Sequence, residues 1–232
     1  MTGAQVGLLG NNVEGNLNGI QLGGAFVSIV KGNLNGAQIG GGVNFVARDS
    51  DGDNGHPDGI QIQIGALVNG TYGDLNGAQV SLLNGAGGDL NGAQVSLLAN
   101  NIGGKMTGAQ VSLLANNIEG NMTGAQVGLL LNWVMGKGND KGNSVGVQIG
   151  GLLGNVVFGD LDGMQLGLVN YAWDVTGVQA GGLFNIASSL NGVQIGLINI
   201  AGKVERGVQI GLWNQIERDG WAPILPLVNG HF

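Results

Sequence analysis

The feature that most constrains this chain is the tripeptide Gly-x-Gln, which recurs along its 232 residues at a nearly constant interval. A short period of this kind is the signature of a repeat architecture, in which each unit packs on its neighbours. The glutamines of the thirteen copies are Gln5, Gln21, Gln38, Gln61, Gln79, Gln94, Gln110, Gln126, Gln148, Gln165, Gln179, Gln194 and Gln209. Most of the intervals between them are 15 to 17 residues, so the basic unit is 15 to 16 residues long.

The residues around each glutamine alternate in character, as expected for a β-strand. Val193, Ile195 and Leu197 alternate with Gln194 and Gly196, and a period of two residues is typical of strands and not of helices. Each such segment is bracketed by pairs such as Asn-Gly and Thr-Gly, which supply the positive φ angles that tight turns need. Helix-forming charged residues are too scarce to build an amphipathic helix, so the chain is predicted to be all-β.

The length of the unit predicts how the strands are arranged. A unit of this size holds about 10 to 12 strand residues and two tight turns, which is one rung of a two-sided coil. In a stack of rungs each residue lies above its equivalent, so apolar columns pack in register and Gln and Asn columns hydrogen-bond through their amides. We therefore predict a single-domain β-solenoid of about thirteen 15–16-residue rungs over residues 1–220. The 49 glycines and the apolar content of 43% argue against a disordered chain.

The sequence leaves two answers to the question of which columns face inward. Ala4, Val6 and Leu8, with their equivalents, form the more apolar set, and burying them costs no desolvation of polar groups. We expect this set inside and the Gln and Gly/Ser columns on a flat outer face. The reverse arrangement would place a satisfied glutamine ladder in the core and leave an apolar exterior that suits a partner or a lipid.

The first interruption of the repeat, near residues 47–58, is rich in aspartate. Asp49, Asp51, Asp53 and Asp58 provide carboxylates with glycines between them, and Ca²⁺ binds such oxygens with flexible geometry. The segment lacks the glycine and the final glutamate of an EF-hand loop, so a solvated acidic loop is the alternative reading. No other cofactor is expected.

Two further segments depart from the repeat. The insertion near residues 133–144 is rich in Gly, Asn and Lys and is expected to be a flexible excursion. Residues 221–232 contain Pro223 and Pro226, and proline has no N–H to donate to a sheet, so this segment is predicted to cap the last strand edge. The terminal Phe232 is also similar to the aromatic end of bacterial outer-membrane barrels.

Composition and motifs argue against several classes of function. Only eight Lys and Arg residues and a net charge of −7 disfavour nucleic-acid binding. The chain has no cysteine, two histidines and no nucleotide-binding glycine motif, so no catalytic constellation is recognisable and an enzyme is not expected. No apolar run is long enough for a transmembrane helix, and the N-terminal segment lacks the features of a secretory signal, which an exported protein would have lost.

Two short stretches carry a resemblance to a known family. The segments at 192–201 (GVQIGLINIA) and 225–232 (LPLVNGHF) resemble the surface-repeat proteins first noted in Leptospira and found in other bacteria. Units similar to these cover essentially the whole chain, and the resemblance implies a bacterial surface protein. A weaker likeness is to curlin repeats, whose Q-x-G-x-x-N-x-A core is similar to the stretch at 194–201, although the second glutamine of curlin repeats is absent.

Taken together, these features predict a non-enzymatic β-solenoid at the bacterial cell surface or in the extracellular space. Its role would be structural or interactive, as in adhesion, scaffolding or assembly, with a protein or surface as partner or through self-association. Nucleic acid is not expected as a partner, and membrane contact is left open. The alternatives are an outer-membrane β-barrel and a curli-like fibre subunit.

Overall fold

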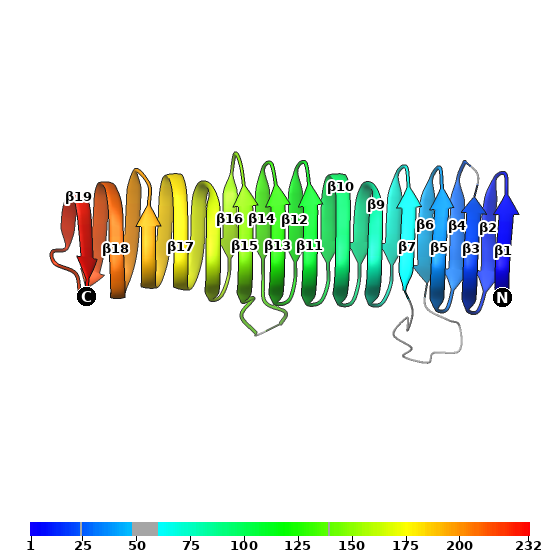
Figure 1. Ribbon diagram of the computed structural model, residues 1–232, viewed down its shortest axis with the longest axis horizontal. Helices are drawn as coiled ribbons and strands as arrows, with labels where there is room; N and C mark the ends of the chain where they lie inside the picture. Colours follow the sequence, from blue (N-terminus) through cyan, green and yellow to red (C-terminus); the bar gives the residue numbers. More distant parts are fainter. Residues whose placement is uncertain (24, 48–59, 139) are drawn as a thin grey trace. The chain divides into compact units, whose positions relative to one another are not determined.

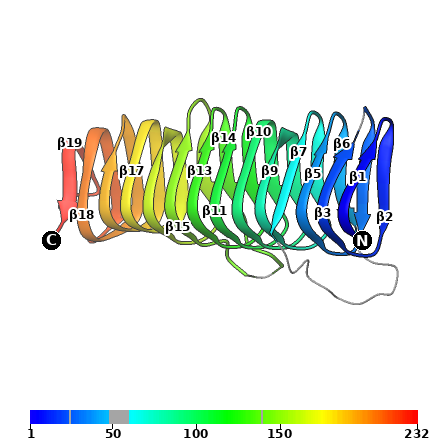
Figure 2. The same cartoon turned by 45° about the vertical axis from the view of Figure 1, so that its right-hand side comes forward.

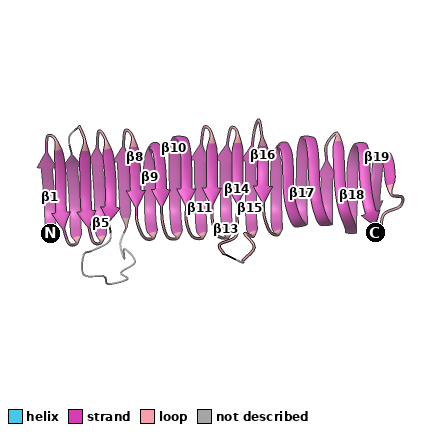
Figure 3. Cartoon of the chain, turned by 180° about the vertical axis from the view of Figure 1, so that it is seen from behind, coloured by secondary structure: helices cyan, strands magenta, loops and turns pink. Residues whose placement is uncertain are grey.

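The structure is a computed structural model that describes residues 1–23, 25–47, 60–138 and 140–232. All regular elements in these ranges are β-strands joined by short turns (Figure 3). Residue contacts divide the chain into unit 1, Met1–Leu113, and unit 2, Leu114–Phe232. Each unit is a parallel β-solenoid, which confirms the predicted fold class, with about twelve turns along the chain where the sequence counts thirteen.

Unit 1 alternates between two kinds of strand (Figure 1). The first strand of each coil carries the Gly-x-Gln tripeptide, and the second carries a buried Asn or Ser. In β9 and β10 both strands of one coil are joined without a break. The strands are β1 (Thr2–Gly7), β2 (Gly10–Glu14), β3 (Leu17–Gly23), β4 (Val27–Lys31), β5 (Leu34–Gly40), β6 (Val43–Ala47), β7 (Gln61–Gly65), β8 (Val68–Thr71), β9 (Leu75–Ala86), β10 (Leu90–Ile102) and β11 (Met106–Ser112).

Unit 2 repeats this arrangement. Its strands are β12 (Ala115–Ile118), β13 (Met122–Gly128), β14 (Leu131–Val134), β15 (Ser144–Gly150), β16 (Gly154–Val157), β17 (Leu161–Ile195), β18 (Ile198–Arg218) and β19 (Ile224–His231). The long β17 and β18 each continue around the coil without a break. Within each unit the first and second strands form two separate layers (Figure 2).

The register places equivalent residues of successive coils side by side. In unit 1, β1 pairs in parallel with β3 and aligns Gln5 with Gln21, while β6 pairs with β8 and aligns Asn44 with Asn69. In unit 2, β15 pairs with β17, and Gln148 aligns with Gln165. The strands therefore pair with the next strand of their own kind, as a solenoid requires.

The glycine of Gly-x-Gln is required by the close approach of successive coils. Gly163 has a φ of +146°, and a Cβ atom there would lie 2.0 Å from the carbonyl oxygen of Gly146. The same carbonyl contact recurs at the equivalent glycines, for example Gly192 against Gly177. Any side chain would overlap the backbone of the preceding coil, so the glycine of the tripeptide is a consequence of stacking.

The core corrects the expectation about which columns face inward. The glutamines of the ladder are buried, with Gln21 at 0% exposure, whereas Val6 is 76% exposed and Leu8 is 91% exposed. The predicted inner set of Ala4, Val6 and Leu8 and its equivalents therefore faces outward, and the Gln column and the Gly/Ser column face inward. The physical reason is that a buried amide carries little penalty when all its hydrogen bonds are made.

The apolar part of the core comes from other positions. The first strand contributes the residue four positions before the glutamine, such as Leu90 or Leu161, and the second strand contributes a residue such as Ile102 or Val157. A typical coil therefore buries two apolar side chains beside its two amides, whereas a few coils place a serine or threonine at one of these positions, such as Ser144, Thr71 or Ser28.

Gln61 is a second correction, because it does not belong to the glutamine column. β7 pairs with β5 so that Gln63 aligns with Gln38, and Gln61 aligns with Gly36 in the glycine column. Gln63 also aligns with Gln79 in β9. The stretch GIQIQIG contains two overlapping candidates, and the interval of 16 residues from Gln63 to Gln79 fits the repeat better than the interval of 18 from Gln61.

The C-terminal segment of unit 2 differs from the coils before it. β19 pairs antiparallel with β18, and Gln209 lies opposite Asn229. The segment is held by a bond from the Trp221 N–H to the Gly230 carbonyl (2.9 Å) and by the Trp221 and Phe232 rings, whose centroids are 5.6 Å apart. β19 thus occupies the hydrogen-bonding edge of the last coil.

Candidate functional site

A continuous ladder of glutamine amides runs through unit 1. The Nε2 atom of each glutamine donates to the Oε1 atom of the glutamine one coil before it, at distances from 2.6 to 3.0 Å. Several of the same Nε2 atoms also donate across the core to the second strand, as from Gln63 to the Gly70 carbonyl (3.2 Å). The members are Gln5, Gln21, Gln38, Gln63, Gln79, Gln94 and Gln110.

Unit 2 contains an equivalent ladder with distances from 2.7 to 2.9 Å. Its members are Gln126, Gln148, Gln165, Gln179, Gln194 and Gln209. The last amide oxygen, Oε1 of Gln209, is buried and accepts no hydrogen bond. Of the thirteen glutamines expected in the ladder, all except Gln61 therefore lie in one of the two ladders.

A second ladder of asparagine amides runs beside the first, in the opposite direction. In unit 2 the Nδ2 atom of Asn132 donates to Asn155 (2.9 Å), the next coil along, and Asn155 donates to Asn170 (2.8 Å). The asparagine donors therefore point toward the C-terminus, whereas the glutamine donors point toward the N-terminus. The asparagines also donate to backbone carbonyls, as from Asn155 to Leu166 (2.8 Å). These amides hold the coil together and are enclosed, so they offer no binding surface.

The outer surface beside the ladders is apolar because the amides occupy the inside. In the first strands, the residue after each glutamine points outward and is typically about 40% exposed, as at Ile149 and Val95. The residue before the glutamine is Ala, Val, Ile or Met and also faces outward. The structure therefore has the arrangement that the sequence analysis held as the alternative, with an amide core and an apolar exterior.

The turns between first and second strands form the most exposed apolar feature of unit 2, which we call the leucine edge. Leu152 and Leu153 are 57% and 58% exposed, and Leu212 is 67% exposed. The edge lies along the upper turns in Figure 1. Its members are Leu129, Leu152, Leu153, Leu168, Leu183, Leu197, Leu212 and Trp213. The same turns of unit 1 expose Leu8, Leu9, Phe26, Leu67, Leu83, Leu97 and Leu113.

Charged residues are confined to the other side of the coil. In the described part of both units, every Asp, Glu, Lys and Arg lies between the second-strand Asn or Ser and the next ladder glutamine, or beyond Asn214 in the last coil. None lies between a ladder glutamine and the Asn or Ser that follows it. This segregation is readable in the sequence once the two strand types are distinguished, and it makes each coil amphipathic from edge to edge.

An ion pair in unit 1 illustrates the charged edge. The Lys31 ammonium donates to a Glu14 carboxylate oxygen at 2.9 Å, across two adjacent coils. The hydrogen bond and the charge of Lys31 lower the pKa of Glu14. Both side chains are exposed, so this pair adds little to stability.

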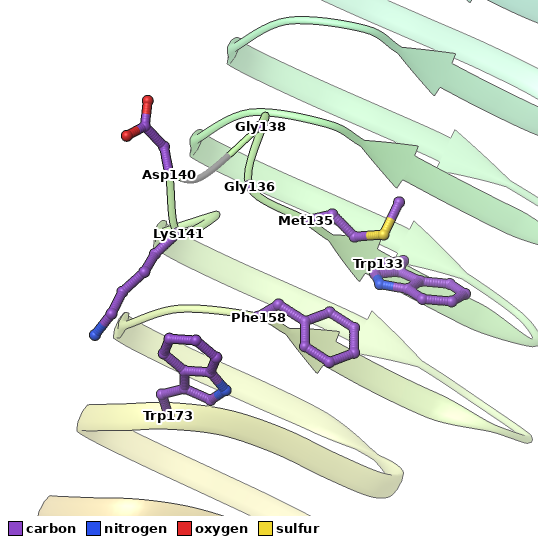
Figure 4. Close-up of a pocket in the computed structure, with 8 residues that line it drawn as sticks. All are labelled: Trp133, Met135, Gly136, Gly138, Asp140, Lys141, Phe158 and Trp173. Atoms are coloured by element: carbon purple, nitrogen blue, oxygen red, sulfur yellow. The ribbon is translucent and has the colours of Figure 1, made fainter.

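An aromatic hollow lies on the outer side of the second strands in unit 2 (Figure 4). Its volume is about 440 Å³, and its lining includes Trp133, Met135, Phe158 and Trp173 together with the loop that holds Lys141. The centroids of Trp133 and Phe158 are 6.0 Å apart, and the Phe158 ring lies 5.8 Å from that of Tyr171. These aromatics are distant in sequence, and only the coil register brings them together.

The loop beside this hollow is tied to the solenoid at its base. The Gly142 N–H donates to the Phe158 carbonyl at 3.1 Å. Gly136 and Gly142 have no room for a side chain, because a Cβ atom at either would overlap the backbone of the other arm of the loop. The insertion predicted near 133–144 thus begins inside β14 and ends at the first residue of β15, and several of its described residues, such as Met135 and Lys141, line the hollow.

The candidate calcium ligands Asp49, Asp51, Asp53 and Asp58 lie outside the described residues. Within the described ranges there is no group of three or more His, Asp or Glu side chains that could hold a metal ion. Nor do those ranges contain a helix long and apolar enough to cross a membrane. No protein-family model, curated protein or solved structure was found to be similar to this chain.

Proposed function

We propose that this chain is a non-enzymatic structural protein of the bacterial surface or extracellular space, and that it rests on a lipid surface through its leucine edges. The observation that carries the proposal is the separation within each coil of an uncharged, leucine-rich edge from an edge that holds all the described charges. An amphipathic element of this kind lies in a membrane interface with its apolar side buried and its charges in water.

Backbone hydrogen bonding supports a lipid as the occupant of this edge. The backbone groups of successive turns hydrogen-bond to one another. The Leu152 N–H donates to the Leu129 carbonyl (2.7 Å), and the Leu153 N–H donates to the Leu130 carbonyl (2.9 Å). A segment placed in lipid must satisfy its backbone internally, since hydrocarbon offers no partners. A protein interface would be expected to present a polar rim around its apolar centre, and these turns carry none.

The energy available is sufficient for stable attachment. A half-exposed leucine that loses its remaining contact with water contributes about 1 kcal/mol, at about 25 cal/mol per Å² of apolar surface. The leucine edge of unit 2 has seven such leucines, together with Trp213. The chain carries a net charge of −7, so neutral lipid is the preferred surface and anionic lipid is disfavoured.

Flotation of the purified chain with phosphatidylcholine vesicles tests the proposal. We expect the wild-type chain to float with the vesicles, and the double variant Leu152→Ser, Leu153→Ser to bind about thirtyfold more weakly, since two half-exposed leucines are worth about 2 kcal/mol. The matched control is Lys203→Ser, Glu205→Ser on the charged edge, which should float like the wild type. Binding should persist in high salt, because the interaction is apolar.

Two outcomes would contradict the lipid proposal. One is a wild-type chain that stays unbound at every lipid concentration. The other is equal flotation of the leucine and control variants. Concentration-dependent self-association without lipid, abolished by the leucine variant, would instead identify a second copy of the chain as the occupant.

A curli-like fibre is the second candidate function. It is favoured by the in-register stacking that starts at β1 and β3, where Gln5 aligns with Gln21 as identical residues align in a cross-β fibre. The position of β19 on the last coil opposes growth at the other end. Thioflavin-positive, denaturant-resistant filaments that grow faster when residues 221–232 are removed would support this candidate.

A further inference from the structure

We propose that the aromatic hollow of unit 2 binds a neutral sugar ring, with the apolar face of a pyranose stacked on the aromatic side chains and its hydroxyl groups directed at the charged loop. This inference does not depend on lipid binding. The hollow lies on the second strands near the charged edge, and the leucine edge lies at the opposite turns.

The solenoid register builds the aromatic surface. Trp133 and Tyr171 share one outward column, since β14 aligns Trp133 with Val156 and β16 aligns Val156 with Tyr171. Phe158 lies just past the end of β16, Trp173 lies two residues after Tyr171 in β17, and both line the hollow beside this column. Four aromatic rings from three successive coils thus line one face, held by a backbone that stacking keeps rigid. A prepared surface of this kind loses little conformational entropy when a ligand binds.

The polar groups beside the rings are few and are placed on one side. The Lys141 ammonium lies 4.7 Å from the centroid of Trp173 and 3.7 Å from an Asp160 oxygen. Asp140 lies on the loop arm that also carries Lys141 (Figure 4). The site therefore combines apolar ring faces with the Lys141 ammonium as donor and the neighbouring Asp160 carboxylate as acceptor, which is the composition of a small-molecule site that fixes orientation through a few polar contacts.

The charges indicate that the ligand is neutral. The Lys141 ammonium, 4.7 Å from the centroid of Trp173, would repel a ligand cation at this end of the hollow but not a neutral ring. A ligand anion would be opposed by the carboxylates of Asp140 and Asp160 and by Asp174 next to Trp173. A pyranose has an apolar C–H face and a rim of hydroxyls that both donate and accept, so it matches rings flanked by an ammonium and a carboxylate. The hollow, at about 440 Å³, is within the range of small-molecule sites.

The test is a glycan array probed with the full chain, followed by titration of the best neutral glycan in solution without lipid. We expect neutral pyranose glycans to bind, and Trp173→Ala to weaken binding at least tenfold, because stacking on a tryptophan is lost. Lys141→Met should also weaken binding about tenfold, because a charge-assisted hydrogen bond is lost. Lys141 is half-exposed, so this second variant leaves the fold intact.

The matched control is Trp213→Ala, which removes a tryptophan from the leucine edge, away from the hollow, and should leave glycan affinity unchanged. The proposal is overturned if no neutral glycan binds, if Trp173→Ala and Lys141→Met bind as well as the wild type, or if tetramethylammonium chloride binds more tightly than any glycan. Failure of vesicle flotation would leave these results unaffected.

Discussion

Replacing one glutamine of the unit 2 ladder with leucine measures directly how much the buried amides stabilise the fold. Gln165 donates to Oε1 of Gln148 (2.8 Å) and to the Tyr171 carbonyl (3.2 Å), and it accepts from Nε2 of Gln179 (2.9 Å). Leucine has a similar size but makes none of these bonds. Gln165→Leu therefore leaves the Gln148 oxygen without its ladder donor and the Gln179 amide without its ladder acceptor.

The expected destabilisation follows from those two groups. A buried polar atom left unsatisfied costs about 1–3 kcal/mol, and the added apolar burial of leucine offsets part of that cost, so the net loss is about 2–4 kcal/mol. Gln179 keeps its bond to the Ile186 carbonyl (3.3 Å), which limits the loss on that side. Urea unfolding followed by circular dichroism measures the change in the free energy of unfolding.

The neighbouring residue supplies the control. Leu166 points outward on the same strand and is partly exposed, so Leu166→Gln leaves no polar group unsatisfied in the core and should cost only about 1 kcal/mol. If Gln165→Leu were no more destabilising than Leu166→Gln, the amide ladder would not be a stabilising element of the core, and the assignment of inner and outer faces would be refuted.

Three further predictions concern other parts of the chain. Gly163→Ala should destabilise unit 2 by about 3 kcal/mol or more, measured by thermal unfolding, because the new methyl group would overlap the Gly146 carbonyl at a positive φ. Lys31→Met should return the pKa of Glu14 toward its ordinary value, as followed by NMR titration. The ion pair stabilises the fold above the unfolded pKa of Glu14 and is lost as the pH falls through the lowered pKa, so wild type and variant should converge in stability at low pH. Removing residues 221–232 should expose the edge of β18 and increase light scattering from aggregates, whereas the intact chain stays clear.

The repeat period was sufficient to predict the coil, because stacking imposes the same constraint on every unit. The Gly-x-Gln glycine and the alternating strand both have direct structural counterparts. The prediction that Asn-Gly and Thr-Gly pairs form turns was wrong, because Asn91-Gly92 lies inside β10 and Thr107-Gly108 lies inside β11, where the glycine allows successive coils to approach closely. The interval between copies also contains the information that separates Gln63 from Gln61, since only Gln63 keeps the following copy one repeat away.

The predicted orientation of the strands was wrong, because the desolvation cost was considered for single residues and not for a stack of identical residues. An isolated buried glutamine is costly, whereas a glutamine between two others completes its hydrogen bonds in both directions. The difference in cost arises because the neighbouring coils supply the hydrogen-bond partners, and a single repeat does not show these partners. The aromatic hollow was missed for a related reason: an insertion separates Trp133 from Phe158, so these two residues are 25 positions apart and the 15–16-residue period does not relate them.

The opposed directions of the two amide ladders determine how the solenoid can grow. In an α-helix the aligned peptide dipoles add to a field along the axis, which favours opposite charges at the two ends. Here the glutamine amides point one way and the asparagine amides the other, so their dipoles largely cancel within a coil that carries both. An inserted or deleted coil therefore leaves the electrostatic potential at the ends nearly unchanged, and the number of repeats can vary through gene duplication with no electrostatic limit on length.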